Sequence, residues 1–551
     1  MQSSTVSRLR PRREVLMLVA LGAWPALIRL VALLHPERIV WGDEPFYLWL
    51  GRNWLTGRGY SFTGYPDVHH TPMYPLLSGL FYLLTRDLEL ASDICYVLFG
   101  ALLVVPIYLL AKEMYCREAG YISAALLAIY PAVATAPLFW GTLTEPPYYF
   151  FVYTGLLMTL LAIRRRRSGF YALAGVCFGL AYLTRPEAIA YVALGGVILV
   201  VVRLFERRLF ARATLAGLSL YLVGFLLFFL PYVYYVHGQT GSWMVSEKAG
   251  VTFVTCIGLS EGDTQAFDEA TWGLDSTGHE VFFFSRESYH VSMLDVIRAY
   301  PSEFVQLVVR NARRFVGSLL STRLFSSYLL PLLGLALFKT AWDRDRLKAE
   351  LLLVASLAPV AVFLLFFVQD RYIATLLPTL IIWLGLGAYE LGIWLLGTLG
   401  QLLAHRLPKS EAMQNLLVAG PTVLLILFLA ILQPRVIQQY TNLASFRPEH
   451  KTVGLWLRDQ VSRDTVIMSR YPAIAFYADA RWEPTPNAEY EQVLDYAQYN
   501  GVDYLVLDEV ETASLRPQLA FLLVDETMPP ELELIHVGDS PRGKLGVFKL
   551  K

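Results

Sequence analysis

Long apolar runs recur along this chain, and they constrain its fold more than any other feature. Hydrophobic residues make up 55% of the 551 residues and charged residues only 17%, against about 25% charged in soluble domains. About eleven runs approach the roughly twenty residues that a helix needs to cross a bilayer. They lie near 15–34, 92–111, 118–136, 146–163, 169–184, 187–203, 214–236, 324–340, 350–368, 373–397 and 415–433. The sequence therefore predicts a polytopic α-helical membrane protein.

The basic clusters indicate how these spans are oriented. The apolar run 72–85 is short and contains Pro72 and Pro75, so we assign it to the membrane interface. Every clear basic cluster then falls on one side, which the positive-inside rule makes cytoplasmic. The clusters are Arg8–Arg13, Lys112–Arg117, Arg164–Arg167, Arg203–Arg212, Lys339–Lys348 and His405–Lys409. We expect a cytoplasmic N-terminus, with 15–34 as an uncleaved anchor, and an extracytoplasmic C-terminus.

Charge and cysteine content narrow the function classes. The formal net charge is zero, so no global field favours nucleic acid. The four cysteines fit neither a metal-binding spacing nor a disulfide framework.

Ionisable residues gather at the predicted outer ends of the spans. They are Asp43, Glu44, His70, Glu145, Arg185, Glu187, Asp370 and Arg371, from four loops. Span ends are ordinarily polar, and acidic residues such as Asp43 and Glu44 are also common in the first turn of a helix. These residues, however, are carboxylates and arginines flanked by prolines and aromatics, which favours a site over an ordinary rim.

Such a layer can carry out group transfer from a lipid phosphate. A carboxylate can deprotonate an acceptor hydroxyl, and an arginine can hold a departing phosphate. We take Asp43 as the base, and Glu44 as better suited to orient an arginine or the loop. Arg371, together with Arg185 and Arg29, is the expected phosphate ligand. Apolar residues over 46–54 recur at helical spacing, which predicts an interfacial helix beside the acidic pair.

The order of these motifs resembles a known superfamily. An Asp-Glu pair follows the first span, an aromatic helix comes next, and His70-Thr71-Pro72-Met73-Tyr74-Pro75 opens a short apolar helix. This order over roughly 10–400 is similar to the GT-C membrane glycosyltransferases. Within them it resembles the protein O-mannosyltransferase and lipid A aminoarabinose transferase group, families 39 and 83.

The resemblance implies an inverting glycosyltransferase with a polyprenyl-phosphate-linked sugar donor. By this resemblance Asp43, with Glu44 beside it, is the base or orients the acceptor, and Glu145 matches a second acidic residue. The acceptor is a protein, a lipid or a glycan on the outer face of the plasma membrane. No β-trefoil is predicted in 237–323, which argues against a eukaryotic-type protein acceptor.

The resemblance also implies a donor-binding set. Arg371 and Tyr372 match a basic-aromatic motif near the lipid phosphate, and His70 takes the place of a Lys or His before the first-loop proline. Arg185 and Glu187 lie in an Arg-Pro-acid motif and are assigned to donor phosphate or sugar binding.

Several alternatives stay open at this stage. No cofactor is required by the sequence, although acidic residues in GT-C sites can hold a divalent metal. A lipid-linked oligosaccharide transferase or ligase would need a wider cavity. A lipid or polysaccharide transporter would carry charges at mid-membrane and repeated halves, and neither pattern is evident here.

The polar C-terminal region predicts a separate domain. The transmembrane domain is expected over 1–440 and an extracytoplasmic α/β accessory domain over 446–551. The expected helices are 452–461 and 488–499, and the expected strands are 465–469, 502–507, 532–536 and 546–550. The run 502–507 is typical of a buried parallel strand. The domain is expected to cover the site or meet the acceptor, or to serve as a structural cap.

Overall fold

A computed structural model describes most of the chain. The residues outside the description are 1–10, 248–251, 253–255, 257–263, 291–292, 403–410, 444, 525–527 and 539–541. The predicted basic residues Arg8 and Arg10 and the whole cluster His405–Lys409 lie outside the described residues.

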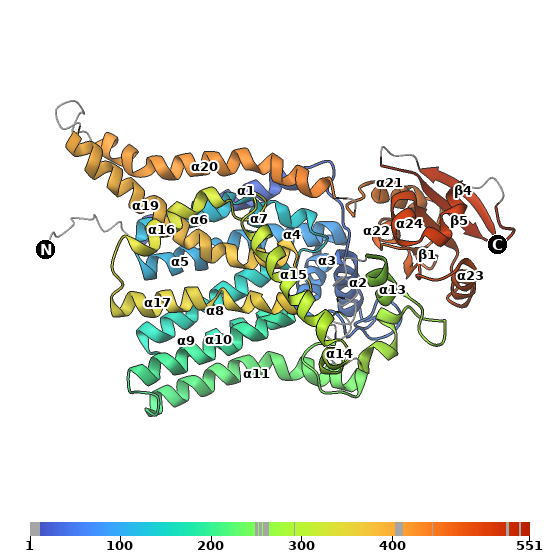
Figure 1. The fold of residues 1–551 in the computed structure, drawn as a ribbon, viewed down its shortest axis with the longest axis horizontal. Coiled ribbons are helices and arrows are strands. Elements are labelled where there is room, and N and C mark those ends of the chain that lie inside the picture. Colours follow the sequence, from blue (N-terminus) through green and yellow to red (C-terminus); the bar gives the residue numbers. More distant parts are fainter. Residues whose placement is uncertain are drawn as a thin grey trace.

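Long helices lie side by side and form an elongated bundle (Figure 1). Their bounds are α1 (Pro11–Leu33), α4 (Leu88–Leu102), α5 (Val104–Met114), α6 (Arg117–Ile129), α8 (Glu145–Arg165), α9 (Ser168–Thr184), α10 (Ile189–Phe205), α11 (Arg212–Thr240), α16 (Leu330–Phe338), α17 (Arg344–Ala355), α19 (Leu377–Leu402) and α20 (Glu411–Thr441). The membrane-protein fold is therefore confirmed.

Within the described ranges, seven helical stretches are long and apolar enough to cross a membrane. They are Leu88–Met114, Glu145–Arg165, Pro186–Phe205, Arg212–Thr240, Arg344–Leu365, Asp370–Thr398 and Leu417–Thr441. Four shorter apolar helices accompany them, at Val19–Leu33, Met73–Thr85, Ser168–Thr184 and Ser327–Phe338. Seven of the predicted spans thus meet the length criterion, and three others are shorter than the sequence pattern suggested.

The predicted span 118–136 is broken. Pro131 has no amide hydrogen, so α6 ends at Ile129 and the chain continues as α7 (Pro131–Ala134) and the 3₁₀ helix η1 (Ala136–Phe139). Arg29 donates from Nη2 to the Val133 carbonyl, 2.9 Å away. The structure therefore uses Arg29, expected as a phosphate ligand, to satisfy the backbone of this broken helix.

Four of the basic clusters within the described residues meet at one end of the bundle, as the topology predicted. Arg165 on α8 lies 2.7 Å from Glu113 on α5. Arg166, directly after α8, and Lys348 on α17 both contact Glu206, which follows α10. Four connections far apart in sequence therefore share this end.

The first loop forms two short helices at the other end of the bundle, α2 (Glu44–Leu55) and α3 (Met73–Thr85) (Figure 1). They cross at Gly51 and Gly79, where a Cβ on Gly51 would lie 2.2 Å from the Pro75 carbonyl oxygen. The helices predicted over 46–54 and 72–85 are both present.

The 237–323 loop contributes helices at this same end. They are α13 (Thr264–Trp272), α14 (Met293–Ala299) and α15 (Pro301–Leu319), and the short α18 (Asp370–Ile373) opens the next outward segment. Asn311 of α15 donates to the carbonyls of Leu364 and Phe366, 3.0 and 2.9 Å away. The loop therefore packs against the segment that leads into α18.

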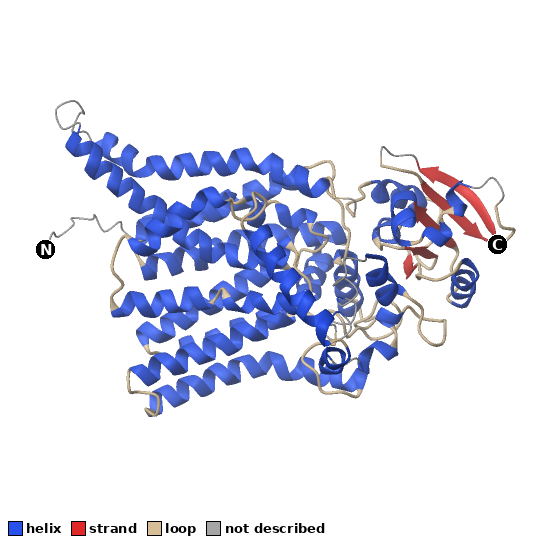
Figure 2. Ribbon diagram, in the orientation of Figure 1, coloured by secondary structure: helices blue, strands red, loops and turns tan. Residues whose placement is uncertain are grey.

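The C-terminal region forms a five-stranded sheet with helices, beyond the end of the bundle that holds α2 (Figures 1 and 2). The strands are β1 (Val466–Ser469), β2 (Arg481–Pro484), β3 (Tyr504–Asp508), β4 (Leu532–Gly538) and β5 (Leu545–Leu550), in the order β2-β1-β3-β5-β4. The helices include α21 (Glu449–Arg458), α22 (Ala473–Tyr477), α23 (Tyr490–Tyr499) and α24 (Glu509–Leu515).

Strand β3 pairs parallel with β1 and antiparallel with β5. The predicted α/β domain and its parallel strand are confirmed. Strand β2 was not predicted, because its residues Arg481–Pro484 show neither a long apolar run nor a clear alternation.

Candidate active site

Two glycines bring the first two outward loops together. The Glu44 amide donates to the Gly141 carbonyl at 3.0 Å. Gly42 and Gly141 both have positive φ, +61° and +73°, and a Cβ on Gly42 would lie 2.7 Å from the Gly141 oxygen. Only glycine fits this approach without displacement. The contact sets the Asp43 loop beside the segment that leads into Glu145.

Asp43 lies at the beginning of α2 and faces Arg371. Its Oδ2 is 4.0 Å from Arg371 Nη2, and its side chain is 36% exposed, against 14% for Arg371. Arg371 Nη2 also donates to the Tyr372 hydroxyl at 2.9 Å. The buried Nε of Arg371 has no hydrogen-bond partner among the described residues. The arginine thus keeps an unused donor beside an accessible carboxylate.

A second arginine binds the other two predicted carboxylates. Arg185 Nη1 donates to Glu145 Oε1 at 2.7 Å, and Arg185 Nε donates to Glu187 Oε1. Glu145 is fully buried, and its Oε2 has no hydrogen-bond partner among the described residues. Arg185 therefore anchors Glu145 and Glu187 in one cluster.

Tyr372 lies close to both arginines. The guanidinium carbons of Arg371 and Arg185 lie 4.9 and 5.0 Å from its ring centroid. The ring stacks on Phe363 at 4.2 Å. An aromatic face stabilises adjacent cations, so Tyr372 holds two positive charges close together.

Glu44 takes a separate partner. It accepts a hydrogen bond from Arg38 Nη2 at 2.8 Å and another from Ser92 Oγ at 2.6 Å. Arg38 also lies 3.1 Å from Asp93. Burial alone would lower the pKa of Arg38, but Glu44 and Asp93 raise it well above its usual range. The geometry gives Glu44 the arginine-orienting position, and Arg38 is a site-supporting residue that the sequence analysis missed.

His70 also lies apart from the arginine cluster. Its Nδ1 is 3.1 Å from Asp67 Oδ1, and its backbone amide donates to Asp67 Oδ2 at 2.8 Å. Burial alone would raise the pKa of Asp67, but His70 lowers it below its usual value. The ring packs against Phe46 and Tyr47. No contact between His70 and Arg371 is found among the described residues.

The sheet domain packs on the loop that carries Asp43. The Val40 amide donates to the Tyr477 hydroxyl at 2.7 Å. Trp41 packs edge-on against Phe446, with ring centroids 5.5 Å apart. One turn into α2, Phe46 lies 5.0 Å from Trp482. The domain therefore braces the loop on either side of Asp43.

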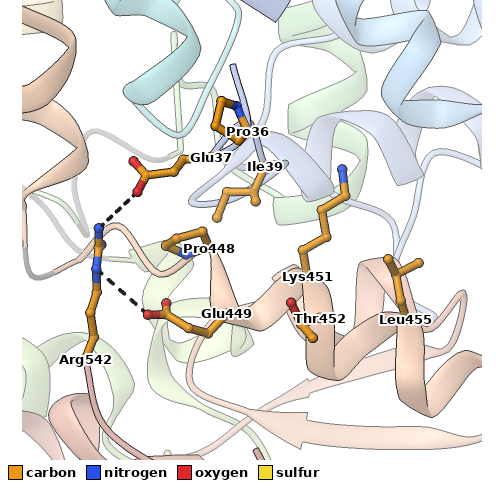
Figure 3. Close-up of a pocket in the computed structure, with 9 residues that line it drawn as sticks. All are labelled: Pro36, Glu37, Ile39, Pro448, Glu449, Lys451, Thr452, Leu455 and Arg542. Carbon is orange, nitrogen blue, oxygen red and sulfur yellow. Dashed lines mark ion pairs between the residues drawn. The ribbon is translucent and has the colours of Figure 1, made fainter. Parts of the chain in front are cut away.

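A pocket of about 460 Å³ lies where the α1–α2 connection meets the sheet domain. Figure 3 shows Arg542 reaching Glu37 and Glu449, at 3.6 and 3.8 Å. Lys451, also on its wall, lies 3.0 Å from Glu89. Because its lining contains neither Asp43 nor Arg371, this pocket is a junction between domains and not the acid–arginine site.

A buried group with metal-like geometry lies in the sheet domain. His450, Asp508 and Glu511 place ligand atoms within 4.8 Å of one another. Arg447 Nη2, however, lies 2.7 Å from Asp508 Oδ2, the same oxygen that faces His450 Nε2 at 3.0 Å. An arginine and a histidine thus already occupy the Asp508 carboxylate, so the group fits a charge network better than a metal site.

Comparison with known proteins identifies the fold. A family model described as dolichyl-phosphate-mannose-protein mannosyltransferase matches residues 69–235. No match is found among curated protein sequences.

Two solved structures resemble the whole chain. ArnT from Cupriavidus metallidurans, solved with undecaprenyl phosphate, matches with a TM-score of 0.55 and 14% identity over 98% of this chain and 98% of that one. The Archaeoglobus fulgidus oligosaccharyltransferase, solved with Zn and sulfate, matches with a TM-score of 0.55 and 15% identity over 96% and 72%. This chain is a membrane protein of the GT-C glycosyltransferase fold.

Proposed function

We propose that this GT-C membrane protein is an inverting glycosyltransferase that moves a sugar from a polyprenyl-phosphate donor to an acceptor hydroxyl. The matched family and the ArnT structure, with its bound undecaprenyl phosphate, support a lipid-linked donor. The acceptor class is a protein, a lipid or a glycan.

One observation carries this proposal. The accessible carboxylate of Asp43 lies 4.0 Å from Arg371, a buried arginine whose Nε has no hydrogen-bond partner among the described residues. A base and an anion ligand side by side are what displacement of a phosphate by a hydroxyl requires.

The proposed step is a single displacement at the anomeric carbon. The acceptor oxygen forms a bond to that carbon while its proton passes to the Asp43 carboxylate. The bond from the anomeric carbon to the phosphate oxygen breaks, and its electron pair stays on the polyprenyl phosphate. Arg371 binds the charge that develops on this leaving group.

The second cluster positions the donor in this proposal. Arg185 is already bound to Glu145 and Glu187. These two carboxylates offset its positive charge where it faces the phosphate. We assign the free Oε2 of Glu145 to a sugar hydroxyl and Tyr372 to holding both arginines. Glu44 and His70 support the loop instead of touching the reacting atoms.

The proposed orientation follows the charge pattern. The basic end of the bundle faces the cytoplasm, and the site, with the domain over 446–551, faces outward from the plasma membrane. The division into domains over 1–440 and 446–551 belongs to the same proposal. No metal is assigned a step.

The test is the Asp43→Asn variant. Purified protein in nanodiscs is supplied with a panel of polyprenyl-phosphate monosaccharides, each labelled in the sugar, and a membrane extract as acceptor. Label should enter a product as free polyprenyl phosphate appears. Asp43 makes no side-chain capping bond to α2, so Asn should fold normally and lower transfer by about 10²-fold or more.

The controls separate this mechanism from its rivals. Asp464→Asn, on the exposed surface of the sheet domain, should leave transfer unchanged. Full turnover in folded Asp43→Asn would overturn the assignment of the base. Movement of label across a liposome membrane without free polyprenyl phosphate would indicate a transporter, and loss of activity with a chelator would favour a metal-dependent transferase.

A further inference from the structure

A second polar pocket lies at the end of the bundle opposite to Asp43. Its volume is about 510 Å³, within the range of small-ligand sites. It opens between the end of α8, the turn after α10 and the beginning of α17. The lining residues are Leu160, Ile163, Arg164, Arg166, Glu206, Asp345 and Lys348. The proposed sugar-transfer chemistry uses none of them.

The charge of this pocket is unbalanced. A single carboxylate, Glu206, faces Arg203 at 2.6 Å, Lys348 at 2.9 Å and Arg166 at 3.3 Å. Partial burial alone would raise the pKa of Glu206, but Lys348 and Arg203 lower it to about 2. Glu206 therefore stays charged and still leaves two positive charges without a carboxylate. Asp345 adds little because it is 83% exposed and 3.8 Å from Lys348.

Two of these cations can reach a ligand. Arg203 is buried, and its other donors bind the Tyr171 hydroxyl and the carbonyls of Ala162 and Ile163. Arg166 and Lys348, by contrast, are 48% and 31% exposed. Both line the pocket.

Exposed apolar residues lie next to the lining residues along α17 and after α10. Leu347 and Leu351 flank Lys348 on α17 and are 51% and 42% exposed, and Phe205 precedes Glu206 and is 83% exposed. A soluble anion would leave this apolar surface uncovered, whereas the acyl chains of a lipid would cover it.

We propose that the pocket between α8, α10 and α17 binds the phosphate of an anionic phospholipid headgroup through Arg166 and Lys348. The acyl chains would run along Leu351 and Phe205. A net anionic headgroup is preferred over a zwitterionic one because the pocket carries excess positive charge. This site is separate from the donor site, which lies at the other end of the bundle.

The test compares two charge-matched variants of the full-length protein. Arg166→Glu/Lys348→Glu alters the pocket, and Arg208→Glu/Arg212→Glu makes the same charge change on exposed residues of the neighbouring turn. Each is purified from mixed micelles of phosphatidylglycerol and phosphatidylcholine with identical acyl chains, and retained lipid is counted by native mass spectrometry. Because charge reversal also repels Glu206, the neutral pair Arg166→Gln/Lys348→Gln is measured alongside.

Wild type and the turn variant, Arg208→Glu/Arg212→Glu, should each retain one phosphatidylglycerol. The charge-reversed and the neutral pocket variants should retain at least about tenfold less. Equal retention by all variants, or equal loss from the turn variant, would overturn the proposal. A separate arm adds inorganic phosphate alone. Inorganic phosphate is then compared with phosphatidylglycerol. If it displaces phosphatidylglycerol and raises Tm as much as phosphatidylglycerol does, the pocket binds soluble phosphate and the lipid assignment fails.

Discussion

Gly42 and Gly141 touch backbone to backbone, which joins the loop of the proposed base to the loop of the second carboxylate. A Cβ on Gly42 would lie 2.7 Å from the Gly141 oxygen, and the next amide but one, that of Glu44, donates to the same oxygen. The position of Asp43 relative to Arg185 and Arg371 therefore depends on two residues without side chains.

We expect Gly42→Ala to lower transfer by about 10²-fold, since a displacement of about 1 Å at a reacting group has this effect. Gly57→Ala is the matched control, because Gly57 also has a positive φ, +82°, but a Cβ there meets nothing within 4 Å. Both variants share the left-handed backbone strain of about 1–2 kcal/mol. Similar activity in the two, measured with the labelled donor, would contradict the role of the glycine contact.

Arg371 should be sensitive to shape as well as charge. Arg371→Gln should lower turnover by about 10²–10³-fold, the usual effect of removing a donor from a developing oxyanion. Arg371→Lys should recover part of the lost turnover, because lysine keeps the charge but lacks the planar guanidinium fork. Arg323→Gln is the control, since Arg323 lies 3.3 Å from Asp370. The kinetic measurement is decisive: full activity in Arg371→Gln would exclude it as the phosphate ligand.

Glu44 and Asp43 should behave differently although they are adjacent. Glu44→Gln removes the charge that offsets buried Arg38, which typically costs about 3–5 kcal/mol. We expect Glu44→Gln to lower Tm clearly while the turnover per folded molecule stays nearly unchanged. Thermal melting and active-site-normalised rates test this, and the opposite result, normal Tm with lost turnover, would make Glu44 catalytic.

The stability of the sheet domain should fall as pH rises. Burial raises the pKa of Glu483 from 4.5 to about 7, against a smaller opposing effect of the Tyr496 hydroxyl. Between these values the folded state binds more protons than the unfolded state, so stability falls with rising pH. One such group changes the free energy of unfolding by at most about 1.4 kcal/mol per pH unit.

Glu483→Gln should therefore flatten the dependence of Tm on pH between about 4.5 and 7. Glu489→Gln, farther along the same domain on the exposed side of a helix start, is the matched control. An unchanged slope in Glu483→Gln would show that this carboxyl titrates normally in the fold.

Much of the architecture was predictable because it rests on local pattern. The apolar runs had to become membrane helices, since a backbone in lipid must satisfy its own hydrogen bonds. The basic clusters likewise predicted that Arg165, Arg166 and Lys348 would share one end, and they do. The break at Pro131 and the strand β2 were missed, because a proline can be tolerated within a span and four residues carry little periodicity.

The sequence by itself determined that carboxylates and arginines would line one end of the bundle. Only the tertiary structure decided which of them pair. Consecutive residues at a helix start point about 100° apart, so Asp43 and Glu44 cannot face the same partner. Asp43 turns to Arg371, which is distant in sequence, and Glu44 turns to Arg38. That choice depends on the packing of α2 against α4 and the sheet domain, and no local pattern in the chain contains it.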